Sequence, residues 1–243
     1  MNTNAKTARI AGILYVLVII GGVFAEFVVR SNLIVAGDTS ATIDNLRSNE
    51  ALFRIGFISD LVAHTCYFLL AFVLYTLLKP VQHDIALLFL LIVVIAAPLL
   101  CLNMLNQFMA LLILTEANYL SAFTAAQVDA LVMLFLDLHK YGYLIGQIFY
   151  GGWLFPLGYV VYKSGYFPKL LGRLLMVASV GYVLDFFRAF LLPDADAALS
   201  GILLAPSVIA EFSFCLWLLV KGANPAKVNA GFVPETASAI PVG

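Results

Sequence analysis

The stretch 57-FISDLVAHTCYFLLAF-72 is almost entirely apolar, yet it carries an acid and an imidazole, Asp60 and His64. It belongs to an apolar run from 53 to 78, and about 20 mostly apolar residues are enough for a helix to span a bilayer. Residues four apart lie on one face of a helix. An ionisable side chain inside a span costs roughly 3 kcal/mol on insertion scales, so it faces other helices. The stretch therefore predicts a membrane-spanning helix with Asp60 and His64 turned toward the bundle interior.

The composition of the whole chain agrees with a membrane protein. Of its 243 residues 63% are hydrophobic and 11% charged, and the mean hydropathy is +1.01. A soluble domain is about 25% charged and about 45–50% apolar. The net charge of −1 and the absence of a basic run argue against a nucleic-acid partner. The expected partners are membrane lipids and a small-molecule or ion ligand, and neither a cofactor nor a metal is predicted.

Further apolar runs give the fold class, an all-α polytopic transmembrane helix bundle with six spans. The six runs are 9–29, 53–78, 85–114, 141–162, 169–192 and 201–221. Two short outer surface helices are expected as well, at 39–53 and at 124–140, the second feeding the fourth span. A seventh span at 124–140 is the less favoured alternative. Residues 1–221 are predicted to form one transmembrane domain, and 222–243, rich in Ala, Pro and Gly, a disordered cytoplasmic tail.

Lys and Arg in the connections predict the orientation, because cytoplasmic loops carry an excess of both. We expect the inner (plasma) membrane, with the N- and C-termini cytoplasmic. The inner cations are then Lys6, Arg9, Lys79, Lys163, Lys169, Arg173, Lys221 and Lys227, and the outer ones Arg30, Arg47, Arg54, Lys140 and Arg188.

Polar residues inside the spans concentrate in their outer halves, whereas the inner halves are nearly pure hydrocarbon, as in 85-IALLFLLIVVIAA-97. Many of them recur at spacings of three or four and so share a helix face. We therefore expect one polar cluster in the outer half of the bundle. The candidate ligand-binding residues are Glu26, Asp60, His64, Asn103, Asn106, His139, Tyr143, Gln147, Asp185, Arg188 and Glu211.

Two stretches, 136-LDLHKYGYLIGQIF-149 and 162-YKSGYFPKLLGRLL-175, are the most specific parts of a wider similarity over about residues 7 to 221. Through them the chain resembles a bacterial family of multi-pass membrane proteins, domain of unknown function 4386. The resemblance implies a helical membrane protein from a bacterium or archaeon. It implies no activity, so no catalytic residue can be named from it.

Three kinds of function suit the cluster. A cavity of carboxylates, amides, Tyr and His suits binding or transport of a small ion or amphiphile, because intramembrane ionisable groups commonly mark such sites. A purely structural or interaction role is the first alternative, with Asp185 pairing with Arg188 or Arg54. An intramembrane metal-dependent or acid/base hydrolase is the second; it would use His64, oriented by Asp60, and His139. His139 is expected at the outer start of its span and His64 deeper, which weighs against a shared metal or haem.

Overall fold

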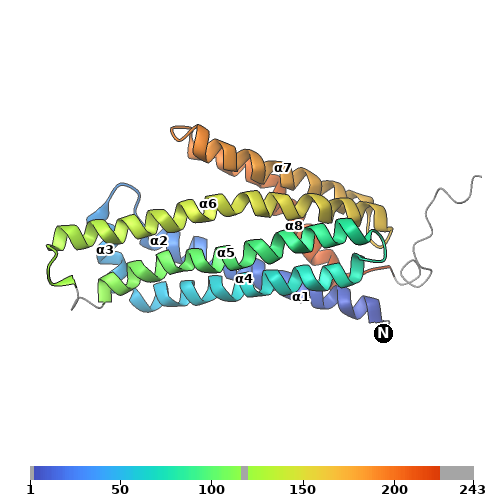
Figure 1. The fold of residues 1–243 in the computed structure, drawn as a ribbon, viewed down its shortest axis with the longest axis horizontal. Coiled ribbons are helices and arrows are strands. Elements are labelled where there is room, and N and C mark those ends of the chain that lie inside the picture. Colours follow the sequence, from blue (N-terminus) through green and yellow to red (C-terminus); the bar gives the residue numbers. More distant parts are fainter. Residues whose placement is uncertain (1–2, 116–119, 225–243) are drawn as a thin grey trace, which may run out of the picture. The chain divides into compact units, whose positions relative to one another are not determined.

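The computed structural model describes residues 3–115 and 120–224, and these form helices without any strand. The helices, labelled in Figure 1, are α1 (Thr3–Val23), the π-helical segment η1 (Phe24–Arg30), α2 (Ser31–Leu33), α3 (Thr39–Ser48), α4 (Glu50–Leu78), α5 (His83–Thr115), α6 (Ala125–Ser164), α7 (Lys169–Leu191) and α8 (Ala197–Val220). The predicted tail lies outside the described residues from 225 onward.

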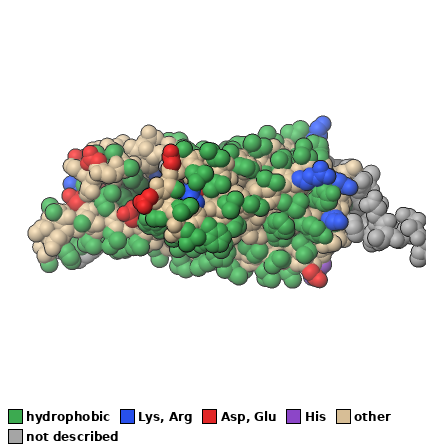
Figure 2. Space-filling model, turned by 90° about the horizontal axis from the view of Figure 1, so that it is seen from above, with side chains coloured by type: hydrophobic (Ala, Val, Ile, Leu, Met, Phe, Trp, Pro, Cys, Tyr) green, Lys and Arg blue, Asp and Glu red, His purple; other side chains and the backbone are tan. Residues whose placement is uncertain are grey.

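Six segments are long and apolar enough to cross a membrane, by length and composition. They are Ala5–Leu33, Glu50–Leu78, His83–Thr115, Ala125–Ser164, Lys169–Leu191 and Ala198–Val220. Each contains most of one predicted run, so the six-span helix bundle is confirmed. Hydrophobic side chains also cover most of the face in Figure 2, and Ile20, Phe27 and Leu191 are among the most exposed. Such a surface suits contact with lipid chains.

The two predicted surface helices have different outcomes. The first, expected at 39–53, exists in part as α3, which ends at Ser48, because residues 50–53 already belong to α4. α3 starts where the Asp38 side chain accepts a hydrogen bond from the Ala41 amide at 2.9 Å. The second is not a separate helix but the first part of α6, and the alternative of a seventh span is wrong. The capping box is present, because Thr124 donates its amide to Gln127 Oε1 at 2.9 Å. No Gly or Pro follows before Gly142, so the helix continues without a break into the fourth span.

The chain divides into two compact units, which we describe separately. The Arg30 unit consists of 14–69 and 93–149, and the α7–α8 unit consists of 1–13, 70–92 and 150–243. The prediction of a single domain over 1–221 stays a prediction.

The Arg30 unit has a hydrophobic core to which η1, α3, α4, α5 and α6 all contribute. Its fully buried members include Val29, Leu46, Phe53 and Val132. α1 and α4 meet at Gly21, where an added Cβ would lie 2.9 Å from the Ala63 Cβ and 3.0 Å from the Ser59 carbonyl oxygen. Small residues allow helices in a membrane to approach closely, and such contacts replace the hydrophobic driving force. Gly21 thus places Ser59, and with it Asp60, against the helix that leads into η1.

The α7–α8 unit is held by similar close contacts. α7 packs along α8. α6 and α7 meet at Gly158 and Gly172, where a Cβ on either glycine would lie within 2.7 Å of the other's carbonyl oxygen. Farther along the same pair of helices, Ser179 Oγ donates a hydrogen bond to the Gly151 carbonyl at 2.7 Å. Neighbouring backbones therefore pass too close for larger side chains at these points.

Candidate functional site

The π-helical segment η1 carries the first two residues of the candidate site, Glu26 and Arg30. A π-helix bonds from residue i to i+5 and is often found at functional sites. Here the Ser31 amide and its hydroxyl both reach the Glu26 carbonyl, the hydroxyl at 2.9 Å. Arg30 Nε donates to Glu26 Oε2 at 2.8 Å. The segment thus ends the first span with an acid–base pair rather than with an unpaired acid.

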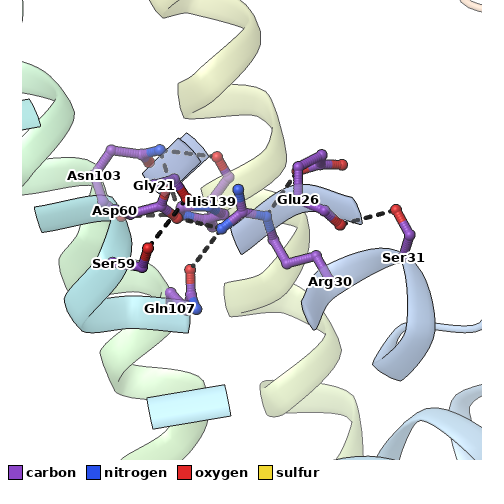
Figure 3. A network of polar contacts seen from close by, with 9 residues as sticks. All are labelled: Gly21, Glu26, Arg30, Ser31, Ser59, Asp60, Asn103, Gln107 and His139. Carbon is purple, nitrogen blue, oxygen red and sulfur yellow. Dashed lines mark hydrogen bonds and ion pairs between the residues drawn. The ribbon is translucent and has the colours of Figure 1, made fainter. Parts of the chain in front are cut away.

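Arg30 is the centre of the polar network (Figure 3). Its side chain is only 10% exposed. One terminal nitrogen, Nη1, forms an ion pair with Asp60 Oδ2 and also donates to Gln107 Oε1 at 3.3 Å. Asp60 is 6% exposed and Glu26 52%, so the cation has one buried and one half-exposed acid. We call Glu26, Arg30, Asp60, His64, Asn103, Gln107 and His139 the Arg30 cluster.

Gln107 on α5 has spare hydrogen-bonding capacity. The residue is 1% exposed, and no group of the described chain accepts a hydrogen bond from its Nε2. The amide orientation follows from its neighbour: a donating Arg30 nitrogen requires the Gln107 oxygen to face it. Nε2 therefore points away from the guanidinium as a buried donor.

One of the predicted amides, Asn103 on α5, contacts α6 (Figure 3), and a second, Asn106, bonds to it. Asn103 Nδ2 donates to the His139 carbonyl at 2.9 Å and lies 3.4 Å from His139 Nδ1. Asn106 Nδ2 donates to Asn103 Oδ1 at 3.0 Å. Gly142 permits this approach, because a Cβ there would overlap the Asn103 carboxamide. The pair thus forms a polar contact between α5 and α6.

His64 differs from the prediction in its partner. Asp60 was expected to orient the imidazole, but the carboxylate pairs with Arg30 instead. A guanidinium is permanently charged and offers five donors, so it competes successfully with a neutral ring for a carboxylate. His64 is buried, lies within the electrostatic reach of Arg30 and His139, and forms no hydrogen bond with the described part of the chain.

His139 also lies elsewhere along its span than expected. The prediction began the fourth span at 141, which put His139 at the outer start and His64 deeper. α6 begins at Ala125, so His139 lies fourteen residues into the helix (139 − 125) and inside the apolar segment. At this position His139 contacts Asn103 on α5.

The other two α6 candidates have different surroundings. Gln147 is 2% exposed, whereas Tyr143 is 40% exposed. Burial is what a binding amide inside a span requires, and the exposure of Tyr143 suits an aromatic side chain at a lipid surface.

The remaining candidates belong to the α7–α8 unit. Asp185 is fully buried and accepts a hydrogen bond from Arg188 Nε at 2.5 Å. This is the first of the two partners expected for it; Arg54, the other, pairs with Glu50 at 2.7 Å. Glu211 on α8 accepts a hydrogen bond from the Tyr182 hydroxyl on α7 at 2.9 Å. These contacts join neighbouring turns and helices within that unit, and a single cluster of all eleven candidates stays a prediction.

Two hollows in the Arg30 unit lie apart from the Arg30 cluster. One of about 170 Å³ is lined by Leu46, Arg47, Glu50, Leu111, Leu114 and Thr115. Another of about 230 Å³ lies along one face of α4 and is lined by Ile58, Leu61, Val62, Thr65 and Cys66. Neither includes a predicted site residue.

The side chains that could bind a metal ion do not form a group among the described residues either. Across 3–115 and 120–224, no three His, Cys, Asp or Glu side chains come together in a group that could hold a metal ion. Asp60, one helical turn before His64, is paired with Arg30.

Sequence comparison supports the family resemblance. Residues 10–222, nearly the whole helical part, match the sequence profile described as "Domain of unknown function (DUF4386)". The chain belongs to the DUF4386 family. A relative of this DUF4386 protein is an uncharacterized protein of the archaeon Archaeoglobus fulgidus, 40% identical over 84 residues. The matched region is 35% of this chain and 48% of the relative, so the match spans about half the length of that protein. No solved structure matches the chain.

Sequence reasoning missed two members of the Arg30 cluster in this DUF4386 protein, Arg30 and Gln107. Arg30 was assigned to an outer connection because it follows the predicted end of the first span. Its spacing of four from Glu26 inside the apolar stretch 24-FAEFVVR-30 was the available signal. Gln107 directly follows the candidate Asn106 and lies four residues after Asn103, and this spacing was the signal available for it.

Proposed function

We propose that the Arg30 cluster binds an amphiphile whose head group presents hydrogen-bond acceptors. The observation that carries the proposal is the buried, unpartnered Nε2 donor of Gln107 next to the Arg30 guanidinium. Leaving a buried polar group unsatisfied costs about 1–3 kcal/mol. A ligand oxygen that accepts this hydrogen bond would offset that cost.

The charges of the cluster favour such a ligand over a cation. Both acids of the Arg30 cluster are engaged by Arg30. The unused capacity lies in donors, because the second terminal nitrogen of Arg30 has no hydrogen bond to the described residues and is drawn without a dashed line in Figure 3. A cation would have to displace Arg30 from its carboxylates, whereas a carboxylate or carbonyl oxygen only adds a bond.

The surroundings suit a ligand that arrives through the membrane. Glu26 carries the polar network to the surface, and its neighbours Phe27 and Val28 are 67% and 45% exposed. An acyl or alkyl chain can lie on such apolar side chains while its head group reaches Arg30. We further propose that this end faces the outside of an inner (plasma) membrane, with both termini cytoplasmic, as the Lys and Arg distribution predicts. Binding, rather than transport, is what these contacts support.

A structural role is the second candidate. The Arg30–Asp60 pair and the Asn103–His139 contact support it, because both join different helices of the Arg30 unit. The hydrolase alternative gains no geometric support, since Asp60 does not orient His64.

The two candidates predict different results for Gln107→Met, which keeps the side-chain length and removes the amide. The assay is the thermal stability of the detergent-purified chain with decanoic acid, decanol or decylamine, three probes that share a ten-carbon chain. For a binding site, decanoic acid stabilises the wild type most and decylamine least, and Gln107→Met abolishes the difference. For a structural site, the three probes act alike on both proteins, which would refute the binding proposal.

Asn106→Leu is the matched control, because it removes an amide one residue away that bonds only to Asn103 in the described structure. Under the binding proposal this variant keeps the preference for decanoic acid. A loss of the preference in Asn106→Leu and not in Gln107→Met would also contradict the proposal.

A further inference from the structure

The turn between α6 and α7 gathers three cations around aromatic rings. Lys169 Nζ lies 5.6 Å from the centroid of the Tyr162 ring, and the Arg173 guanidinium carbon lies 5.4 Å from the same centroid. Lys163 Nζ lies 5.8 Å from the centroid of Tyr159. The Tyr162 ring therefore has two cations within cation–π distance, and a third cation, Lys163, directly follows Tyr162 in the chain.

Helix packing holds the cations together. Gly158 and Gly172 bring the end of α6 and the start of α7 into backbone contact. Gly165 adopts a positive φ of 64°, which lets the chain reverse over four residues between Ser164 and Lys169. Two oppositely directed helices thus present their basic ends at the same turn.

No acid neutralises this group within the described residues. The ion pairs there involve Arg30, Arg47, Arg54, His83 and Arg188, and none involves Lys163, Lys169 or Arg173. Among the residues that the structure describes, the turn therefore carries a local positive charge without an acid at ion-pair distance.

The neighbouring surface is apolar. Leu170, between the two α7 cations, is 61% exposed, and Val177 two turns along α7 from Leu170 is 55% exposed. Both helices are candidate membrane spans; α6 ends and α7 begins at this turn. In a bilayer that both helices cross, the cations would therefore lie where the hydrocarbon gives way to the head groups. Basic residues near an anionic leaflet attract its lipids by about 1 kcal/mol each.

We propose that Lys163, Lys169 and Arg173 form a binding site for the head group of an anionic phospholipid. The phosphate binds between the two α7 cations over Tyr162, and the acyl chains lie along Leu170 and Val177. The site is separate from the Arg30 cluster and does not depend on its function.

The experiment measures stabilisation of the detergent-purified chain by phosphatidylglycerol, compared with phosphatidylcholine of the same acyl chains and with inorganic phosphate. The test variant is Lys169→Gln/Arg173→Gln. The matched control is Lys79→Gln/Lys140→Gln, which removes two cations that each lie over a tyrosine, at 5.7 Å and 5.9 Å, at separate places. The wild type should respond to phosphatidylglycerol above the other two additives. Each cation removed from the site should weaken that response about 5-fold.

Several outcomes overturn the proposal. One is an equal loss of the response in test and control variants, which would mean that only overall charge matters. Another is an unchanged response in the test variant, and a third is equal stabilisation by inorganic phosphate, which would indicate a site for a free anion. Arg173→Lys is a second control: it keeps the positive charge and should retain most of the response to phosphatidylglycerol. Should the test variant misfold, the lipid that co-purifies with Arg173→Lys and Arg173→Gln decides: equal phosphatidylglycerol content contradicts the site.

Discussion

Replacing Asp60 by Asn should destabilise the protein strongly, because it leaves Arg30 without its buried counter-charge. The Arg30 side chain is 10% exposed, and the acid that remains, Glu26, is half in solvent or lipid at 52%. Breaking a buried ion pair by removing one partner costs about 3–5 kcal/mol. The surviving bonds to Glu26 and Gln107 offset part of the loss, so we expect a decrease of about 3 kcal/mol in the free energy of unfolding.

Two matched variants test the reason for this loss. Glu26→Gln removes the half-exposed acid from the same guanidinium and should cost at most about 1 kcal/mol, as exposed pairs do. Arg30→Met combined with Asp60→Asn removes both charges and keeps similar volumes, so the double variant should be more stable than Asp60→Asn alone by about 2 kcal/mol.

The assay is unfolding of the purified protein in mixed micelles by increasing the fraction of sodium dodecyl sulfate, followed by tryptophan fluorescence. The reasoning fails if Asp60→Asn and Glu26→Gln lower the free energy of unfolding by the same amount, because burial would then not decide the strength of an ion pair with Arg30. It also fails if the costs of Arg30→Met and Asp60→Asn simply add in the double variant, since an uncompensated charge would then not be the cause.

Two further predictions use contacts outside this ion pair. Gly21→Ala should lower the free energy of unfolding by about 1–3 kcal/mol, because the added Cβ would press on α4. In the same assay the control Gly22→Ala, whose Cβ would have no neighbour within 4 Å, should be neutral or slightly stabilising, and equal effects of the two variants would contradict a close contact at Gly21. Asp185→Ala should lower the free energy of unfolding by about 3 kcal/mol, because it leaves the 14% exposed Arg188 side chain without its acid. Arg54→Ala, in which Arg54 and its partner Glu50 are 47% and 42% exposed, should cost under about 1 kcal/mol, and a larger loss for Arg54→Ala would contradict the argument from burial.

The sequence predicts the membrane-spanning helices well but their boundaries and connections poorly. The six apolar runs identify the spans because the bilayer requires length and hydrophobicity, and both can be counted along the chain. The merging of 124–140 into α6 was harder to foresee, because a surface helix and the first turns of a span differ in their surroundings and not in local pattern. One consequence was that His139 was expected at the start of its helix, whereas it lies fourteen residues after the first residue of α6 (139 − 125).

The assignment of Arg30 shows a second limit. An arginine at the predicted end of a span is equally compatible with snorkelling to the surface and with a buried pair. The π-helical turn of η1 decides between these, because it aims the side chain at α4 and α5. Hydrogen-bond geometry of this kind depends on neighbouring helices and has no recognisable pattern in the sequence.

By itself, the sequence determined that this chain is an all-helical membrane protein with six spans and with costly polar groups inside them. Only the tertiary structure decided which of those groups meet: Asp60 with Arg30, Asn103 with His139, and Asp185 with Arg188. The physical reason is that transfer to a bilayer depends on each residue's own polarity. The choice of a partner depends on distances between helices, which the packing at positions such as Gly21 and Gly142 sets.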